Sequence, residues 1–384
     1  MTSPHQHFHR LAWLAVALAA CVIVFGGFVR LSNAGLSCPD WPTCYGKATW
    51  PQHDHEVDAA NQAFPQRAVE THKAWREQFH RHIAATLGVM VLGLALMAVR
   101  GRRFGRGRVL LASGIIGLAI PLYMNGLYAA SGALTAVGLC ILLHAAWRWS
   151  NEDFASIAVL TLGVIVVQAM LGLWTVSWLL KPIVVMAHLL GGLTTFSLLL
   201  WIAWRSTPDR TLVAGNAAAL RRMTIVGLVL LAVQIALGGW TSANYAALAC
   251  GTDFPTCLGQ WWPAADFREA FVLWRGIGVD YEGGVLDAPA RAAIQLSHRW
   301  FAWLVFGHLL VLALRLRRTP GLSGWGWALG LGLGAQIGLG ISNVVFGLPL
   351  AVATAHLAGA LVLLAVLVTL LARLRPPRAM MANV

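Results

Sequence analysis

Four histidines stand at matching positions in two stretches of the chain that resemble each other. His80 and His298 are each followed by an arginine, and His188 and His356 each lie in an Ala-His-Leu triplet. All four are expected within the first turn or two of an apolar helix that enters a membrane from its outer side. Because ionisable residues inside membrane segments are rare, four of them at equivalent positions indicate a functional site.

The residue types and their placement favour haem ligation. Each half of the chain places two imidazoles on different helices at a similar depth, where they can bind the two axial faces of a haem iron. The first half contributes His80 and His188, and the second half contributes His298 and His356. Zinc and copper also accept imidazole, but no cysteine or carboxylate cluster accompanies either pair. A polar side chain that merely hydrogen-bonds a neighbouring helix would explain a lone histidine better than four.

One acidic residue distinguishes the two halves. Glu77 lies one helical turn before His80, on the same face, whereas Gln295 occupies the equivalent position in the second half. A carboxylate beside an axial ligand can accept a proton or stabilise positive charge, and an amide cannot act as a base at neutral pH. The difference predicts chemistry in the first half, although Glu77 would also be explained by an ion pair with Arg81 or Arg76.

Arg81 and Arg299 directly follow their histidines, and two interpretations of them remain open. Their guanidinium groups would suit bidentate contacts with haem propionates. Alternatively, they anchor the helix ends at the membrane interface.

Four of the six cysteines form two close pairs, Cys38 with Cys44 and Cys250 with Cys257. Both pairs fall in loops that are expected outside the cytoplasm, where disulfides form, so disulfides are favoured over zinc. The spacing does not decide whether the first disulfide is structural or exchanges with a redox partner.

The composition identifies the elements that carry these residues. Of the 384 residues, 58% are hydrophobic and 11% are charged, and the net charge is +13. In soluble domains about a quarter of the residues are charged, so a soluble protein is excluded. Basic nucleic-acid-binding surfaces lie on soluble folds, so a nucleic-acid-binding protein is excluded as well. Since about 20 apolar residues cross a bilayer, the sequence predicts an all-α polytopic membrane protein. Its ten expected spans lie near 11–29, 80–99, 109–127, 131–147, 155–178, 183–204, 223–243, 293–314, 324–346 and 350–372.

The distribution of charge predicts the orientation. One side of these spans holds 17 Lys and Arg against three acids, Glu152, Asp153 and Asp209, while the other side holds 11 and 12. By the positive-inside rule, both termini are cytoplasmic and the long loops 30–79 and 244–292 face out. The first apolar segment lacks a cleavage pattern and is interpreted as a membrane helix.

The chain is also a tandem repeat. Each half contains a plain helix, a histidine helix, a plain helix and a histidine helix, but the first half has 50 more residues between its histidines. Two inserted spans account for the surplus and preserve the orientation of everything that follows. The prediction is a tandem repeat of two four-helix transmembrane bundles related by an axis along the membrane normal. The expected limits are 1–204 with the inserted pair at about 103–152, a cytoplasmic linker at 205–222, and 223–384.

Several motifs together resemble the haem A synthase family. They are the run from Gly26 to Cys44, the Glu77-x-x-His80-Arg81 motif, the later histidine helices and the duplicated cysteine loop. The resemblance covers nearly the whole chain apart from about 100–150. The family core has eight helices, so the inserted pair departs from it.

The resemblance implies an enzyme that oxidises a methyl group of haem O to the formyl group of haem A, with oxygen drawn from water. It implies that His80 and His188 hold haem O, that His298 and His356 hold haem b, and that the family's acid is Glu77. Its first-loop cysteines correspond to Cys38 and Cys44. It also implies a bacterial inner membrane, lipid contact, haem O synthase as a partner and an unidentified electron acceptor, and leaves a homo-oligomer open.

The main alternative is a di-haem b-type membrane cytochrome that transfers electrons without altering either haem. A pure electron conduit does not require the difference between Glu77 and Gln295. A transporter is less favoured, because broken and charged mid-membrane helices are lacking.

Overall fold

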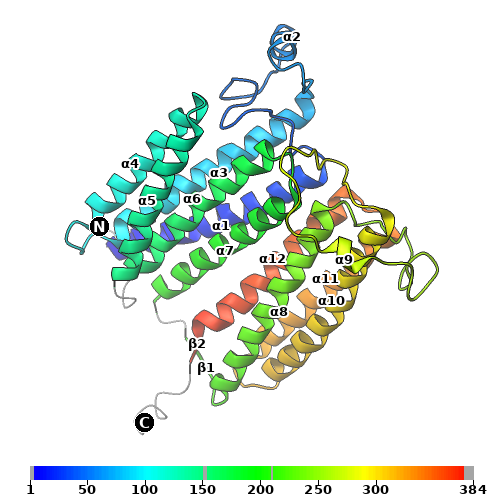
Figure 1. Ribbon diagram of the computed structural model, residues 1–384. Helices are drawn as coiled ribbons and strands as arrows, with labels where there is room; N and C mark the ends of the chain where they lie inside the picture. Colours follow the sequence, from blue (N-terminus) through cyan, green and yellow to red (C-terminus); the bar gives the residue numbers. More distant parts are fainter. Residues whose placement is uncertain (1–3, 150–153, 209–210, 376–384) are drawn as a thin grey trace. The chain divides into compact units, whose positions relative to one another are not determined.

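The computed structural model describes residues 4–149, 154–208 and 211–375, so Glu152, Asp153 and Asp209 lie outside the described residues. The described chain is almost entirely helical, as predicted, with one short pair of parallel strands (Figure 1). The helices are α1 (Pro4–Leu31), α2 (Asp54–Ala63), α3 (Thr71–Ala98), α4 (Gly105–Met124), α5 (Tyr128–Arg148), α6 (Ala155–Ser177), α7 (Pro182–Ser206), α8 (Ala217–Ala243), α9 (Phe267–Ala270), α10 (Ala288–Arg317), α11 (Ser323–Val345) and α12 (Leu350–Arg373). The strands are β1 (Leu212–Val213) and β2 (Leu374–Arg375).

Ten of the described helices are long and apolar enough to cross a membrane, and they correspond one to one to the ten predicted spans. The chain is therefore a polytopic membrane protein. The other two helices, α2 and α9, are short and lie in the two long loops that follow α1 and α8.

The first histidine helix of each half begins earlier than predicted. α3 starts at Thr71 and α10 at Ala288, because each helix continues through polar turns beyond its apolar stretch. At the start of α10, the Asp287 carboxylate accepts a hydrogen bond from the backbone N–H of Ala290 at 3.0 Å, which satisfies one of the free N–H groups of the first turn. The prediction that all four histidines occupy the first turn or two was therefore wrong for His80 and His298, which lie in the third turn.

The chain divides into two compact units, and each is described by itself. Unit 1 comprises 1–22, 38–173 and 191–207, and unit 2 comprises 23–37, 174–190 and 208–384. These units are not the two predicted sequence repeats, since segments of α1, α6 and α7 belong to unit 2. The predicted repeat limits stay a prediction.

Unit 2 contains a four-helix arrangement. α8 packs against α10 and α12, and α11 also packs against α10 and α12 (Figure 1). α10 and α12 therefore lie diagonally opposite each other, and both are histidine helices. This packing is consistent with the predicted second bundle.

In unit 1, the predicted inserted spans form a closely packed helical hairpin, α4 and α5. Gly138 allows the close approach, because a Cβ at this position would lie 2.5 Å from the Cγ1 atom of Ile116. The Ser131 hydroxyl adds a hydrogen bond of 2.8 Å to the carbonyl of Ala119. The hairpin is a well-formed element in its own right.

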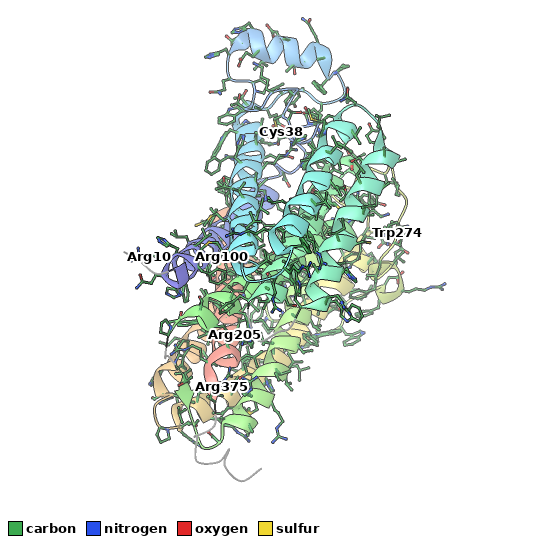
Figure 2. The ribbon with its side chains drawn as sticks, turned by 90° about the vertical axis from the view of Figure 1, so that its left-hand side faces the viewer. Arg10, Cys38, Arg100, Arg205, Trp274 and Arg375 are labelled. Atoms are coloured by element: carbon green, nitrogen blue, oxygen red, sulfur yellow. A yellow bond between two sulfur atoms is a disulfide. The ribbon has the colours of Figure 1, made fainter. Side chains whose placement is uncertain are left out.

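The arginines labelled in Figure 2 lie away from the labelled loop residue of their own unit. In unit 1, Figure 2 shows Arg10, Arg100 and Arg205 away from the end that carries Cys38. In unit 2, Arg375 and Trp274 lie at opposite ends. This separation is consistent with the predicted charge asymmetry, and the orientation of the termini stays a prediction.

Candidate functional site

The second histidine pair lies inside unit 2 on diagonal helices. His298 is on α10 and His356 is on α12. Both residues are partly buried, and the Nδ1 atom of His356 has no hydrogen-bond partner among the described residues. Within the described chain, no three His, Cys, Asp or Glu side chains gather as a metal-binding cluster. A two-histidine site is thus the metal chemistry that these residues can offer.

A glutamine from a plain helix contacts each of these histidines. The Nε2 atom of Gln234 on α8 lies 3.1 Å from Nδ1 of His298 and donates to the carbonyl of His298, also at 3.1 Å. The Nε2 atom of Gln336 on α11 lies 3.4 Å from Nε2 of His356. Neighbours of this kind fix the orientation of an imidazole ligand. The sequence analysis gave these glutamines no role, although Gln-x-x-x-Gly recurs at 168–172, 234–238 and 336–340.

A glycine one turn after each glutamine leaves room for the imidazole. A Cβ at Gly238 would lie 3.0 Å from Cε1 of His298, and a Cβ at Gly340 would lie 3.1 Å from Cε1 of His356. Larger residues at these positions would displace the rings. The residues of unit 2 therefore fit bis-histidine ligation of a haem, with two imidazoles on diagonal helices and small residues beside them.

The glycine contact leads to a prediction about haem content. On the prediction that His356 is an axial ligand of haem b, Gly340→Val is expected to lower the amount of haem b bound per protein several-fold, because the new side chain would press on the His356 ring. Gly334→Val is a matched control on the same helix, since no atom lies within 4 Å of the Cβ position of Gly334. The measurement is the ratio of Soret to protein absorbance in the purified proteins. Equal ratios in both variants would contradict the proposed packing.

The first histidine pair is divided between the two units. His80 lies on α3 in unit 1, and His188 lies on α7 in unit 2, so their predicted pairing stays a prediction. The packing of unit 1 nevertheless repeats one detail of unit 2. The side chain of Gln168 lies over Gly191, where a Cβ would be 2.5 Å from Oε1, and that of Gln336 lies over Gly359 in the same way.

Glu77 is buried beneath the first cysteine loop. It is 5% exposed, and its Oε2 atom accepts a hydrogen bond of 2.9 Å from the backbone N–H of Cys38. Its Oε1 atom accepts one of 2.6 Å from the Arg81 guanidinium, which also forms an ion pair with the carboxylate. The ion pair that the sequence left as an alternative is therefore present, and it is joined to the disulfide loop.

Gln295 performs the same anchoring in the second half. Its Oε1 atom accepts a hydrogen bond of 2.8 Å from the backbone N–H of Cys250, and its Nε2 atom donates to the carbonyl of Ala247 at 2.6 Å. An amide thus fixes the second loop where a carboxylate fixes the first. Anchoring alone does not require the negative charge of Glu77.

The two arginines hold the same loops. Nη1 of Arg81 donates to the carbonyls of Asp40 and Thr43 at 2.7 and 2.6 Å. Arg299 donates to the carbonyls of Thr256 and Asp253 at 2.9 and 3.1 Å. Both guanidinium groups thus connect a histidine helix to the cysteine loop that precedes it. Their contact with haem propionates stays a prediction.

The predicted disulfides are confirmed, with bonds between Cys38 and Cys44 and between Cys250 and Cys257. An aspartate closes the turn after each one. The Asp40 carboxylate accepts from the backbone N–H of Gly46 at 2.8 Å, and Asp253 accepts from that of Gly259 at 2.7 Å. Gly46 and Gly259 have φ angles of +74° and +73°, a conformation that favours glycine. In the first loop, burial raises the pKa of Tyr45 to about 12, so its hydroxyl stays protonated and donates to the carbonyl of Arg67 at 3.2 Å.

The chain resembles one known protein family and several individual proteins over most of its length. A family described as cytochrome oxidase assembly protein matches residues 9–121 and 123–368 of the chain. The chain belongs to this family. A heme A synthase of Shewanella oneidensis is 37% identical over 365 residues, which are 94% of this chain and 96% of that protein. Heme A synthases of Rhizorhabdus wittichii and Caulobacter vibrioides are 26% and 27% identical, covering 92% and 95% of this chain and 90% and 96% of their own.

The family match corrects one expectation about the inserted pair. Between residues 9 and 368 the match omits only residue 122, which lies in α4, and it includes α5. The likeness to the cytochrome oxidase assembly protein family therefore includes 100–150. A pair of spans leaves the orientation of later helices unchanged, and homologous chains can therefore carry it without altering the rest of the fold.

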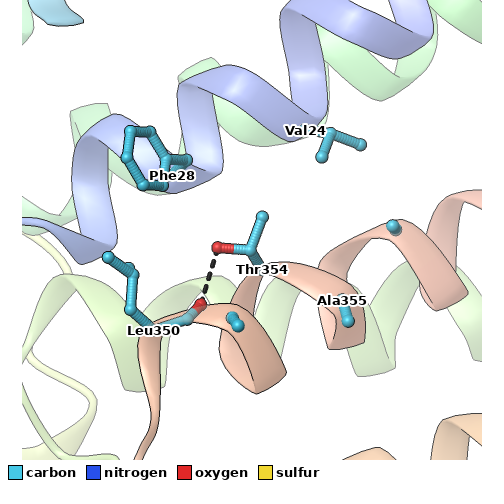
Figure 3. Close-up of a pocket in the computed structure, with 7 residues that line it drawn as sticks. Val24, Phe28, Leu350, Thr354 and Ala355 are labelled. Carbon is cyan, nitrogen blue, oxygen red and sulfur yellow. Dashed lines mark hydrogen bonds between the residues drawn. The ribbon is translucent and has the colours of Figure 1, made fainter.

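One apolar groove in unit 2 was not predicted. It has a volume of about 580 Å³ and is lined by the ends of α1 and α12, including Phe28 and Ala355 (Figure 3). Thr354 lines it as well, but its hydroxyl donates back to the carbonyl of Leu350 at 2.8 Å. The groove therefore offers almost no polar contact. No sequence pattern predicts this groove, because its two walls are more than 300 residues apart in the chain.

Proposed function

We propose that this protein is a haem A synthase, an enzyme that converts a methyl group of haem O into the formyl group of haem A. The membership of the cytochrome oxidase assembly protein family and the names of the relatives support this function. The observation that carries it is the buried carboxylate of Glu77 at a place where Gln295 suffices for loop anchoring in the other half. Glu77 also forms an ion pair with Arg81, and its carboxylate differs from the Gln295 amide in being able to act as a base.

The histidines receive their roles from this proposal. His298 and His356, which fit bis-imidazole ligation, hold haem b, which when bound can take up and pass on one electron at a time. His80 and His188 hold the substrate haem O. The assignment makes the second half an electron relay and the first half the site of reaction.

The reaction consists of two hydroxylations and a dehydration. In each hydroxylation the methyl carbon loses two electrons and two protons overall and gains a hydroxyl group from one water molecule. The first gives the alcohol, and the second gives the geminal diol, which loses water to become the aldehyde. The four electrons require an external acceptor, and haem b held by His298 and His356 would supply a one-electron route to it.

Glu77 is suited to the proton and charge balance of these steps. Its oxygens accept hydrogen bonds from the backbone N–H of Cys38 and from the Arg81 guanidinium, which hold the carboxylate in place. A carboxylate in this position can take a proton from the attacking water or stabilise positive charge on the carbon. Burial strengthens this interaction, because the local dielectric constant is lower than that of water.

The setting of the reaction also belongs to the proposal. We place the protein in the bacterial inner membrane with both termini in the cytoplasm and the disulfide loops outside. Haem O is supplied by haem O synthase, and the product serves cytochrome oxidase, in line with the description of the family.

A product assay tests the function. The protein is expressed together with a source of haem O, and the extracted haems are separated and identified by mass spectrometry. We expect hydroxylated haem and haem A, which a host with an empty vector does not make. If only unmodified haem is recovered with protein that contains bound haem, the di-haem electron-transfer cytochrome becomes the correct interpretation.

A further inference from the structure

A lysine in unit 2 has its charge buried without a hydrogen-bond partner. Lys181 directly precedes α7, and its side chain is 0% exposed. Its Nζ atom makes no hydrogen bond to any described residue. An ammonium group has three N–H donors, and a buried charge without a partner is strongly disfavoured. Such a group is suited to bind an anion.

Two tryptophans enclose this ammonium. Nζ lies 3.3 Å from the ring centroid of Trp274 and 5.4 Å from that of Trp178. The two rings are nearly perpendicular, with centroids 6.1 Å apart. Trp274 is itself 63% exposed and lies at the end of unit 2 opposite Arg375 (Figure 2). Its ring covers the ammonium group. The aromatic faces attract the cation but satisfy none of its N–H donors.

The local electrostatics also favour an anion. Lys181 stands at the N-terminus of α7, where the free N–H groups and the helix dipole add partial positive charge. Burial lowers the pKa of the Lys181 ammonium. A carboxylate beside it would relieve the burial of the charge and the repulsion from the helix end.

The position of Lys181 is defined by the turn that precedes it. Leu179 and Leu180 have φ angles of +48° and +57°, which residues other than glycine seldom adopt. The turn is held by a hydrogen bond of 3.1 Å from the backbone N–H of Tyr281 to the carbonyl of Leu179, and Leu180 packs against Leu36 and Tyr281. Lys181 is therefore placed by packed backbone.

The spacing relates Lys181 to a histidine of the proposed substrate site. His188 follows seven residues later, which is two turns of α7, on the same face and about 10 Å further along the axis. That separation is comparable to the reach from the iron of a haem to the carboxylates at its edge. At the equivalent position before His356 stands Pro349, so only the first half has this charge.

We propose that Lys181 binds a propionate carboxylate of the haem O that is ligated by His188. The inference rests on the proposed function and specifies one polar contact of its substrate. When the substrate enters, the ammonium leaves the face of Trp274 and donates to the carboxylate oxygen. Lys181 would thus distinguish a haem with free propionates from one whose propionates are neutral.

The test measures binding rather than turnover. The full-length protein in detergent is titrated with haem O and with haem O dimethyl ester, and the Soret band reports binding while the resident haem b serves as an internal reference. The wild-type protein is expected to bind haem O roughly tenfold or more tightly than the ester, since a charge-assisted hydrogen bond contributes that much. Lys181→Met should lose most of this preference by weakening haem O binding alone.

Controls separate this contact from a structural role. Lys73→Met removes a lysine from the first turn of α3, which pairs with Glu70 at 2.8 Å, and should keep the preference. Lys181→Arg should keep it too and serves if Lys181→Met does not fold. Equal binding of acid and ester by the wild-type protein, or an unchanged preference in folded Lys181→Met, overturns the proposal. Since the titration needs no product, a failed haem A assay with preference intact would reject only the proposed function.

Discussion

Glu77→Gln should retain bound haem and an intact first loop but lose haem A production by about a hundredfold or more, as expected when a general base is removed. The structure explains why the fold should survive. Gln295 shows that an amide oxygen accepts the N–H of the first cysteine in the preceding loop just as the Glu77 carboxylate does. The variant therefore removes charge and basicity while keeping the hydrogen bond to Cys38. Mass analysis of extracted haems gives the yield, and the visible spectrum gives the haem content.

A matched control for this variant is Glu56→Gln. Glu56 also accepts a backbone hydrogen bond, from Gln52 at 2.8 Å, and pairs with Lys47, but it lies at the start of α2 in the outer loop. Its replacement should leave haem A production unchanged. Normal production by Glu77→Gln would remove Glu77 from the mechanism and leave it the anchoring role that Gln295 has.

His298→Ala and His356→Ala should each abolish the low-spin spectrum of haem b in the purified protein. Each change removes one of the two proposed axial ligands on diagonal helices of unit 2, so six-coordinate low-spin iron would no longer form. The measurement is the absorption spectrum of the reduced and oxidised protein, supported by electron paramagnetic resonance. Haem A production should fall with it, because the electrons lose their route out.

His308→Ala is the control for the loss of a histidine from the same helix. Its Nε2 atom lies 2.8 Å from the carbonyl of Met223, and it stands nearly three turns from His298 along α10. The variant should keep the haem b spectrum. A low-spin spectrum that survives in both His298→Ala and His356→Ala would mean that the axial ligands are other residues.

The membrane fold could be predicted because its cause is local. Long apolar runs and the arginines at their ends determine the number of spans, and all ten were found. The helix starts could not be predicted as well, since polar turns such as 71–79 are compatible with either helix or loop until packing decides. The short α2 and the pairing of β1 with β2 depend on contacts between distant segments, which a single sequence does not show.

The sequence predicted the residues that are proposed to react, but it did not predict the contacts that hold those residues in place. Histidines inside apolar helices and paired cysteines indicate functional residues by their residue type alone. The contacts of Gln234 and Gln336 with the histidines, and the use of Arg81 to hold loop carbonyls, arise from tertiary packing. The buried charge of Lys181 was missed for the same reason, because nothing in its sequence neighbourhood shows that Trp274 covers it.

The interchangeable anchors beneath the two disulfide loops have an evolutionary consequence. Glu77 and Gln295 hold their loops through the same backbone hydrogen bond, and the codons of Glu and Gln differ by a single base. One point mutation could therefore exchange an acid for an amide at this position while the backbone hydrogen bond is kept. In the proposed function, such an exchange would separate a half that carries out chemistry from a half that carries electrons.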